Sequence, residues 1–321
     1  MAYAIEFDES VRAGFSRCAQ EQLDRAIREL SERIAEEPVA AVHAARKAVK
    51  KERSLLRLVR GSLPPAVRRR ENAALRDAAR ELSGARDAEV MITTLDALSE
   101  RYAGQLPEST FAEIRGRLER RRDAHRRRLV GSALGAHAVQ ELGAIRVRAD
   151  EWRLTHGGWD ALQDGLKRSY KDGRAAFARV RSHPSATALH EWRKRVKDLW
   201  LQERLLARAG GPALAGQAKD AHRLSDLLGE DHDLAVLRSE LADGRLPVAA
   251  DGDAVIGLID QRRRALQAEA LQLGRRVYAE PPAAYVRRMR QSWKAGRRQA
   301  AAQRDQHPQA VARATRLPHA A

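Results

Sequence analysis

The sequence is poor in cysteine, in aromatic residues and in long apolar runs, and each shortage excludes a class of protein. One residue of 321 is cysteine, so an internal disulfide framework is excluded and a reducing compartment is expected. Aromatic residues make up 4% of the chain, so Ala, Leu and Val must build most of any core. No apolar run approaches the ~18 residues that a membrane-spanning helix needs. The acidic start, MAYAIEFDES, lacks the pattern of a secretory signal, so we expect a cytoplasmic protein.

Acidic residues are outnumbered by basic ones, and several common site motifs are missing. Lys and Arg number 60 against 43 Asp and Glu, which gives a net charge of +17 with His neutral. This balance indicates a polyanion, a phosphate-rich ligand or an acidic surface as partner, without choosing among them. The sequence has no G-x-x-x-x-G-K-[ST] loop, no C-x-x-C pair and no H-E-x-x-H. A Walker-type nucleotide site and the common zinc motifs are therefore excluded.

Nearly every long segment repeats its apolar residues at the helical period, and none alternates as a strand would. The pattern predicts an all-α fold in which Pro and Gly separate the helices. Pro38 precedes the second helix, and Ser185 is predicted to cap the helix that Gly210 and Gly211 end. Residues 306–321 have no apolar stripe, so we expect a disordered tail. The expected helices are 10–36, 39–60, 65–83, 87–103, 108–130, 132–155, 159–181, 186–209, 213–228, 232–242, 252–279 and 282–304.

One basic pattern occurs twice in the chain. VHAARKAVKKERSLLRL (42–58) aligns with LHEWRKRVKDLWLQERL (189–205), and both fit H-x-x-R-K-x-V-K-x6-R-L. A second similar pair follows, ELSGARDAEV (81–90) and DLLGEDHDLAV (226–236). The repetition predicts an internal duplication with two similar helical halves, 1–150 and 151–305, whose boundary lies near 145–158.

Each copy places its charges on one face of a helix and apolar residues on the other. At about 100° per residue, the basic side chains of the first copy lie within about 60° of its histidine. A charged helix face is most often simply solvated, but such faces usually mix Glu with Lys. Here acids are almost absent, although like charges one turn apart cost a few tenths of a kcal/mol per pair. We therefore expect both stripes to bind a ligand. They consist of His43, Arg46, Lys47, Lys50 and Arg57, and of His190, Arg193, Lys194, Lys197 and Arg204.

The two H-x-x-R-K-x-V-K helices resemble the CHAD family, the conserved histidine α-helical domains. The segments LRDAARELSGARDAEV and LSDLLGEDHDLAVL support the resemblance, which covers about residues 5 to 300. It implies two four-helix bundles related by a pseudo-two-fold axis, with a basic groove between them. It also implies binding of inorganic polyphosphate and, as in some members, association with polyphosphate granules.

Polyphosphate has no base or sugar to recognise, so a track of cations suffices to bind it. Arg can donate hydrogen bonds to two phosphate oxygens at once, whereas Lys acts as a mobile point charge. No catalytic residue, metal or cofactor is expected. The basic segments 117–129 and 285–298 either extend the track or are solvated. The predicted polyphosphate-binding residues are His43, Arg46, Lys47, Lys50, Arg53, Arg57, Arg76, Arg80, Arg86, His190, Arg193, Lys194, Lys197, Arg204, Lys219 and Arg223.

Several alternatives remain open at this point. His43 and His190 either donate to phosphate or make structural hydrogen bonds. Trp192 and Trp200 are expected to point into the core, so both stripes lack stacking aromatics, which weighs against a nucleic-acid-binding protein. A scaffold whose basic face meets an acidic protein is a further alternative.

A metal-dependent phosphohydrolase is the remaining rival, and it would need Asp87, Asp231 and Asp233. The dipeptides Arg86-Asp87 and His232-Asp233 are predicted instead to cap helices and form salt bridges. A triphosphatase domain with an E-x-E-x-K strand often accompanies the family. The closest segment here, EFDES (6–10), has Ser10 where that motif needs Lys, so we expect no catalysis.

Overall fold

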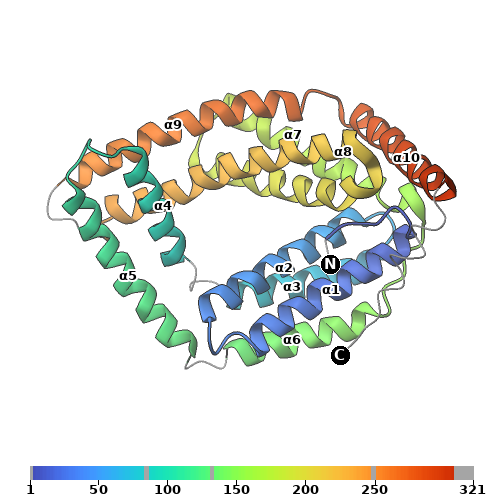
Figure 1. The fold of residues 1–321 in the computed structure, drawn as a ribbon, viewed down its shortest axis with the longest axis horizontal. Helices are drawn as coiled ribbons and strands as arrows, with labels where there is room; N and C mark the ends of the chain where they lie inside the picture. Colours follow the sequence, from blue (N-terminus) through green and yellow to red (C-terminus); the bar gives the residue numbers. More distant parts are fainter. Residues whose placement is uncertain (1–2, 83–86, 131–133, 247–250, 307–321) are drawn as a thin grey trace.

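The computed structural model describes residues 3–82, 87–130, 134–246 and 251–306, and every regular element in these ranges is helical (Figure 1). The all-α prediction is therefore confirmed. Most of the expected tail, 306–321, lies outside the described residues. The helices are α1 (Val11–Ser31), α2 (Pro38–Leu58), α3 (Pro65–Glu81), α4 (Asp87–Arg101), α5 (Glu108–Val130), α6 (Leu134–Ala149), α7 (Gln163–Ser182), α8 (Ala186–Ala242), α9 (Gly252–Val277) and α10 (Pro282–Gln306), with a short 3₁₀ helix η1 (Gly158–Ala161) before α7.

The helices pack as two clusters of four. In the first cluster, α1 packs against α2 and α6, and α3 packs against α2 and α6. In the second, α8 packs against α7, α9 and α10. The remaining pair, α4 and α5, pack on each other, and α4 also contacts α8, so this pair bridges from the first cluster to the second (Figure 1). Each cluster contains one of the two repeated basic helices, whereas the internal duplication itself remains a prediction from the sequence.

The signals at Pro38, Ser185 and Gly211 operate as expected, whereas the helices expected over 10–36 and 132–155 end earlier, at Ser31 and Ala149. Pro38 is the first residue of α2, where its missing N–H costs nothing. Ser185 caps α8, and its hydroxyl accepts the Ala188 N–H at 3.1 Å. Gly211 interrupts α8 with φ of 73°, a conformation that favours glycine. The predicted break between 228 and 232 is wrong, because α8 continues through Gly229 to its end. A glycine inside a helix lowers the stability by about 1 kcal/mol relative to alanine. Burial of the flanking leucines outweighs this cost.

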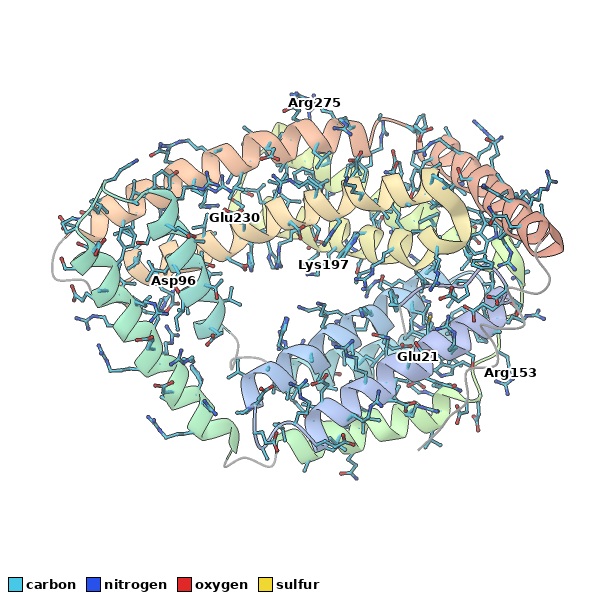
Figure 2. The ribbon with its side chains drawn as sticks, viewed as in Figure 1. Glu21, Asp96, Arg153, Lys197, Glu230 and Arg275 are labelled. Atoms are coloured by element: carbon cyan, nitrogen blue, oxygen red, sulfur yellow. The ribbon has the colours of Figure 1, made fainter. Side chains whose placement is uncertain are left out.

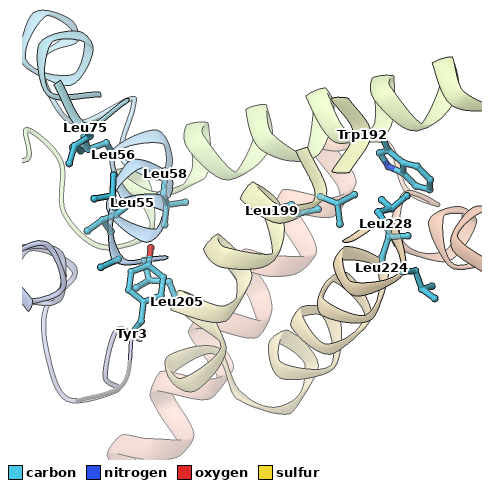
Figure 3. Close-up of a cluster of buried hydrophobic side chains, with 14 of the residues drawn as sticks. Tyr3, Leu55, Leu56, Leu58, Leu75, Trp192, Leu199, Leu205, Leu224 and Leu228 are labelled. Carbon is cyan, nitrogen blue, oxygen red and sulfur yellow. The ribbon is translucent and has the colours of Figure 1, made fainter. Parts of the chain in front are cut away.

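The core consists mainly of Leu, Ala and Val, as the composition requires, and it runs through both clusters. Leu55 and Leu56 of α2 are buried on one side, and Trp192 and Leu228 of α8 on the other (Figure 3). At Gly165 a Cβ would lie 1.8 Å from the Leu58 carbonyl oxygen, so only glycine lets α7 pass this close to the end of α2. No helix in the described ranges is long and apolar enough to cross a membrane.

Candidate functional site

The two repeated basic helices face each other across the junction of the clusters. The Ser54 hydroxyl of α2 donates to the Asp198 carbonyl of α8 at 3.3 Å. The Gln202 amide of α8 donates to the Ser54 carbonyl at 3.5 Å. Arg57 reaches across the same junction, and its Nη2 lies 2.5 Å from Asp198 Oδ1. These contacts hold the C-terminal half of α2 against the middle of the first segment of α8, so the stripes converge.

A hollow of about 370 Å³ opens between the converging stripes. Seven of its lining residues are cationic and two are carboxylates, so its charge is strongly positive. Six of the cations are predicted ligand residues, and Arg195 was not predicted. Lys197 projects from the side of α8 that faces α2 (Figure 2). The lining residues are Lys50, Arg53 and Arg57 of α2, and Glu191, Arg193, Lys194, Arg195, Lys197, Asp198 and Leu201 of α8. We call this space the cationic hollow.

Two arginines of the cationic hollow are held in place by a residue of α3. Arg53 and Arg57 lie one turn apart on α2, and Asn72 Oδ1 accepts from Arg53 Nε at 3.1 Å and from Arg57 Nη1 at 3.4 Å. Asp198 fixes the other end of Arg57. An arginine that is already oriented loses less side-chain entropy when it binds an anion. No local pattern marks Asn72 as part of the site, because its role depends on how α3 packs on α2.

Burial and crowding of like charges alter the pKa values around the hollow. Burial lowers the pKa of Arg53 and of Arg193, and for Arg53 the neighbouring Arg57 adds to the effect. Lys51 lies outside the cationic hollow, beside α1, and burial lowers its pKa to about 8, with contributions from Arg204, Arg25 and Lys47. Each shift reflects the cost of removing a charged base from water, to which neighbouring cations add for Arg53 and Lys51. An added anion would relieve this cost.

Two carboxyl groups lie on the buried faces of the same two helices. Burial raises the pKa of Glu52, on α2, well above its ordinary value, and raises the pKa of Glu203, on α8, to about 8. Both side chains are fully buried, and burial favours the neutral, protonated form of each carboxyl. Neither acid lines the cationic hollow.

The hollow continues toward α4 and α5 but loses its positive excess. A second hollow of about 340 Å³ shares Arg193 and Lys197 with the cationic hollow. A third, of about 740 Å³, shares Thr93, Thr94 and Asp233 with the second. The three together form what we call the central groove. Carboxylates dominate its far end, where Glu36, Glu37, Glu89 and Asp233 accompany His43, Arg122 and Arg126.

Several predicted ligand residues of the first half lie elsewhere. His43 lines the acidic end of the central groove, apart from the cationic hollow. Arg46 donates to the Ala79 carbonyl of α3 at 2.9 Å. Lys47 is exposed on α2, one turn before Lys51. Arg76 and Arg80 are exposed and both pair with Asp77, at 2.9 and 3.7 Å. Arg86 lies outside the described residues.

The second half shows a similar division. His190 lines a separate hollow of about 390 Å³, where its Nδ1 lies 3.4 Å from that of His232. Burial, helped by Lys194 and Arg193, lowers the pKa of His190. Arg223 is exposed and pairs with Glu269 at 2.8 Å. Lys219 is also exposed and lines none of these hollows.

The two tryptophans of the second stripe differ in position. Trp192 is buried, as predicted. The prediction for Trp200 is wrong, because this ring is half-buried and stacks on the His222 ring at 4.3 Å between centroids. Arg204, exposed, places its guanidinium 5.9 Å from the Trp200 centroid. Long cationic side chains beside it, Lys197 and Arg204, partly cover the Trp200 indole at the edge of the helix.

The dipeptides Arg86-Asp87 and His232-Asp233 were predicted to cap helices. Asp87 begins α4, but its side chain lies outside the described residues. His232 and Asp233 lie inside the continuous α8, so neither is a cap, and Asp233 instead lines the central groove. Asp231 is buried and accepts from Arg263 at 3.1 Å and from Gln267 at 2.7 Å. In the ranges that the structure describes, no three His, Cys, Asp or Glu residues cluster as a metal site would need.

Comparison with known proteins identifies the family. The family model described as the CHAD domain matches residues 17–242, more than half of the chain. The chain belongs to the CHAD domain family. Among solved structures, this CHAD protein is similar to PptA from Streptomyces chartreusis, with 17% identity, a TM-score of 0.58 and coverage of 83% of this chain and 98% of that one. It is also similar to the CHAD domain from the plant Ricinus communis, with 17% identity, a TM-score of 0.60 and coverage of 87% and 95%. At this identity the likeness establishes the fold alone. No curated protein matches the sequence.

Proposed function

We propose that this CHAD protein binds inorganic polyphosphate in the cationic hollow and breaks no bond in doing so. The observation that carries the proposal is the convergence of seven cations from α2 and α8, two helices far apart in the sequence. Membership of the CHAD family, which is linked to polyphosphate, agrees with it. A slender, uniformly charged chain suits a hollow with many cations and few other recognition groups.

Binding in this hollow divides into two kinds of contact. Arg53 and Arg57 are held by Asn72, so they offer preoriented N–H groups to phosphate oxygens. Lys50, Lys194 and Lys197 add positive charge around them, and Lys194 also pairs with Glu191 at 2.7 Å. By analogy with single-stranded nucleic acids, the logarithm of affinity should fall with that of salt concentration with a slope of about −0.7 per neutralised phosphate. Five such contacts would give a slope of roughly −3 to −4.

Charge reversal in the groove tests the proposal. The groove variant carries Lys50→Glu, Lys194→Glu, Arg195→Glu and Lys197→Glu, all at residues that line the cationic hollow. A matched control reverses four exposed cations of α10, with Arg287→Glu, Arg290→Glu, Lys294→Glu and Arg298→Glu. Titration with long-chain polyphosphate should show that the groove variant binds at least about 100-fold more weakly, since each charge-assisted contact contributes about 1.5–3 kcal/mol.

The control should bind polyphosphate within about threefold of the wild type, and circular dichroism should show both variants folded. Equal losses in both variants would mean that overall charge, not the cationic hollow, holds the ligand. Equal binding by the groove variant and the wild type would remove the site assignment altogether.

The two rival functions have separate tests. A phosphohydrolase would need Asp231, which Arg263 and Gln267 already engage, and we expect no phosphate release from polyphosphate with Mg²⁺ or Mn²⁺ present. If nucleic acid were the ligand of the groove, polyphosphate would fail to displace it from the wild type. In the cell we propose a cytoplasmic location, with association to polyphosphate granules that the groove variant would lose.

A further inference from the structure

The last helix carries a second set of cations that the central groove does not use. Between Glu280 and Asp305 the sequence has no acidic residue. Four basic residues in this stretch follow one another at steps of three, four and four, so they share one face of α10. All four side chains are exposed. We call them the outer face of α10: Arg287, Arg290, Lys294 and Arg298.

The opposite side of α10 anchors the helix to the molecule. Tyr285, Met289 and Trp293 are buried in the core. Gly296 packs against the bend in α8, where an added Cβ would lie 2.7 Å from the Ala209 carbonyl oxygen. The outer face is therefore a fixed ridge, and α10 lies at the outer edge of the molecule (Figure 1).

Other cations of the molecule show what ordinary solvated charges look like here. On α5, Arg115 pairs with Asp96 at 2.9 Å and Arg117 pairs with Glu113 at 2.9 Å. Arg121 and Arg122 of the same helix also pair with carboxylates. Three arginines of the segment 117–129 are thus compensated by neighbouring carboxylates.

The outer face of α10 lacks such compensation. Within the described ranges its one ion pair joins Arg290 to Asp160 at the long distance of 3.9 Å. Two basic residues beside the ridge make contacts within the molecule instead of facing outward. Arg288 pairs with Glu280 at 2.6 Å, and Arg297 donates to the Glu9 carbonyl at 2.9 Å. The ridge therefore keeps its positive charge directed outward.

We propose that the outer face of α10 binds the phosphate backbone of a double-stranded nucleic acid, independently of the central groove. From Arg287 to Arg298 the ridge spans about 16 Å at 1.5 Å per residue. A duplex carries one negative charge per ~1.7 Å of its axis, so every cation of the ridge meets phosphates. Contacts to phosphate alone carry no base readout, so binding is independent of sequence.

The shape and composition of the ridge favour a duplex over other polyanions. A flexible chain such as polyphosphate would lose conformational entropy on a convex surface without walls, whereas a duplex is already stiff over about 150 base pairs. The ridge has no aromatic side chain on which single-stranded bases could stack. The large apolar residues of α10, Tyr285, Val286, Met289 and Trp293, are in the core, so the helix has no bulky apolar side chain to insert into a bilayer.

Titration of the full chain with a labelled duplex of about 20 base pairs tests the proposal. With three to four phosphate contacts, the log–log salt slope should be about −3, so affinity should fall about 30-fold from 50 to 150 mM salt. The α10 variant, with Arg287→Glu, Arg290→Glu, Lys294→Glu and Arg298→Glu, should bind the duplex at least tenfold more weakly. The groove variant should bind it within about threefold of the wild type.

Duplex binding that survives in the α10 variant, or that disappears in the groove variant, would overturn the proposal. So would binding of the wild type to phosphatidylserine vesicles that the α10 variant loses while its duplex binding is unchanged. Glutamine substitutions at the same four positions give a milder second variant if the glutamate variant does not fold. The groove variant reports on polyphosphate binding, and the α10 variant reports on duplex binding. Failure of one proposal therefore leaves the other testable.

Discussion

Glu203, a buried carboxyl of α8 that faces α10, offers a quantitative test of how burial alters ionisation in this fold. Burial raises the pKa of this carboxyl from its ordinary value of 4.5 to about 8, while the Tyr285 hydroxyl donates to its Oε1 at 2.6 Å. Between these two values the folded state keeps a proton that the unfolded state releases. Glu203 therefore costs no stability below pH 4.5, and its cost grows as pH rises toward 8. At about 1.4 kcal/mol per pH unit, the full effect is on the order of 3–5 kcal/mol.

The substitution Glu203→Gln keeps the shape and an acceptor for Tyr285 but has no proton to lose. Urea denaturation at a series of pH values should show that the stability of the variant, minus that of the wild type, rises between pH 4.5 and 8 by on the order of 3–5 kcal/mol and then levels off. Glu32→Gln, at an exposed position, controls for the loss of one carboxyl. A difference that stays flat over this range would mean that burial does not raise the pKa of Glu203.

Three further substitutions probe packing, capping and charge. Gly165→Ala would place a Cβ 1.8 Å from the Leu58 carbonyl oxygen and should lower the free energy of unfolding by about 3 kcal/mol; a change below 1 kcal/mol would argue against the close approach of α7 to α2. Ser185→Ala removes the cap of α8 and should cost about 1 kcal/mol in the same denaturation assay, whereas no change would mean that the cap is dispensable. Asp198→Asn removes a carboxylate from the cationic hollow and should tighten polyphosphate binding about threefold or more, because a nearby like charge costs about 1 kcal/mol. Weaker binding would show instead that the orientation of Arg57 by Asp198 contributes more to affinity than the repulsion between Asp198 and phosphate costs.

The helices could be predicted because their signals are local. Apolar periodicity, Pro38 and the Ser185 cap each act within a few residues, and the structure has them where the sequence placed them. Gly229 shows the limit of such signals, because burial of the surrounding helix decides whether a glycine ends it.

The candidate site could be predicted only in part. Lys50 and Lys197 were identified because they share a face with the motif histidines, and that face does turn toward the other stripe. Asn72 was missed because nothing in its own segment marks it as a partner of Arg53. For Arg76 a signal was available, since Asp77 is its neighbour in the sequence and pairs with it.

The central claim is that cations of α2 and α8 act on one polyphosphate chain, and its salt dependence tests this most directly. The logarithm of affinity would be measured against the logarithm of salt concentration for the wild type, Lys50→Gln, Lys197→Gln and the double variant. Each single substitution should reduce the magnitude of the slope by about 0.7, and the double substitution should reduce it by about 1.4. A slope that either single substitution leaves unchanged would contradict the shared site.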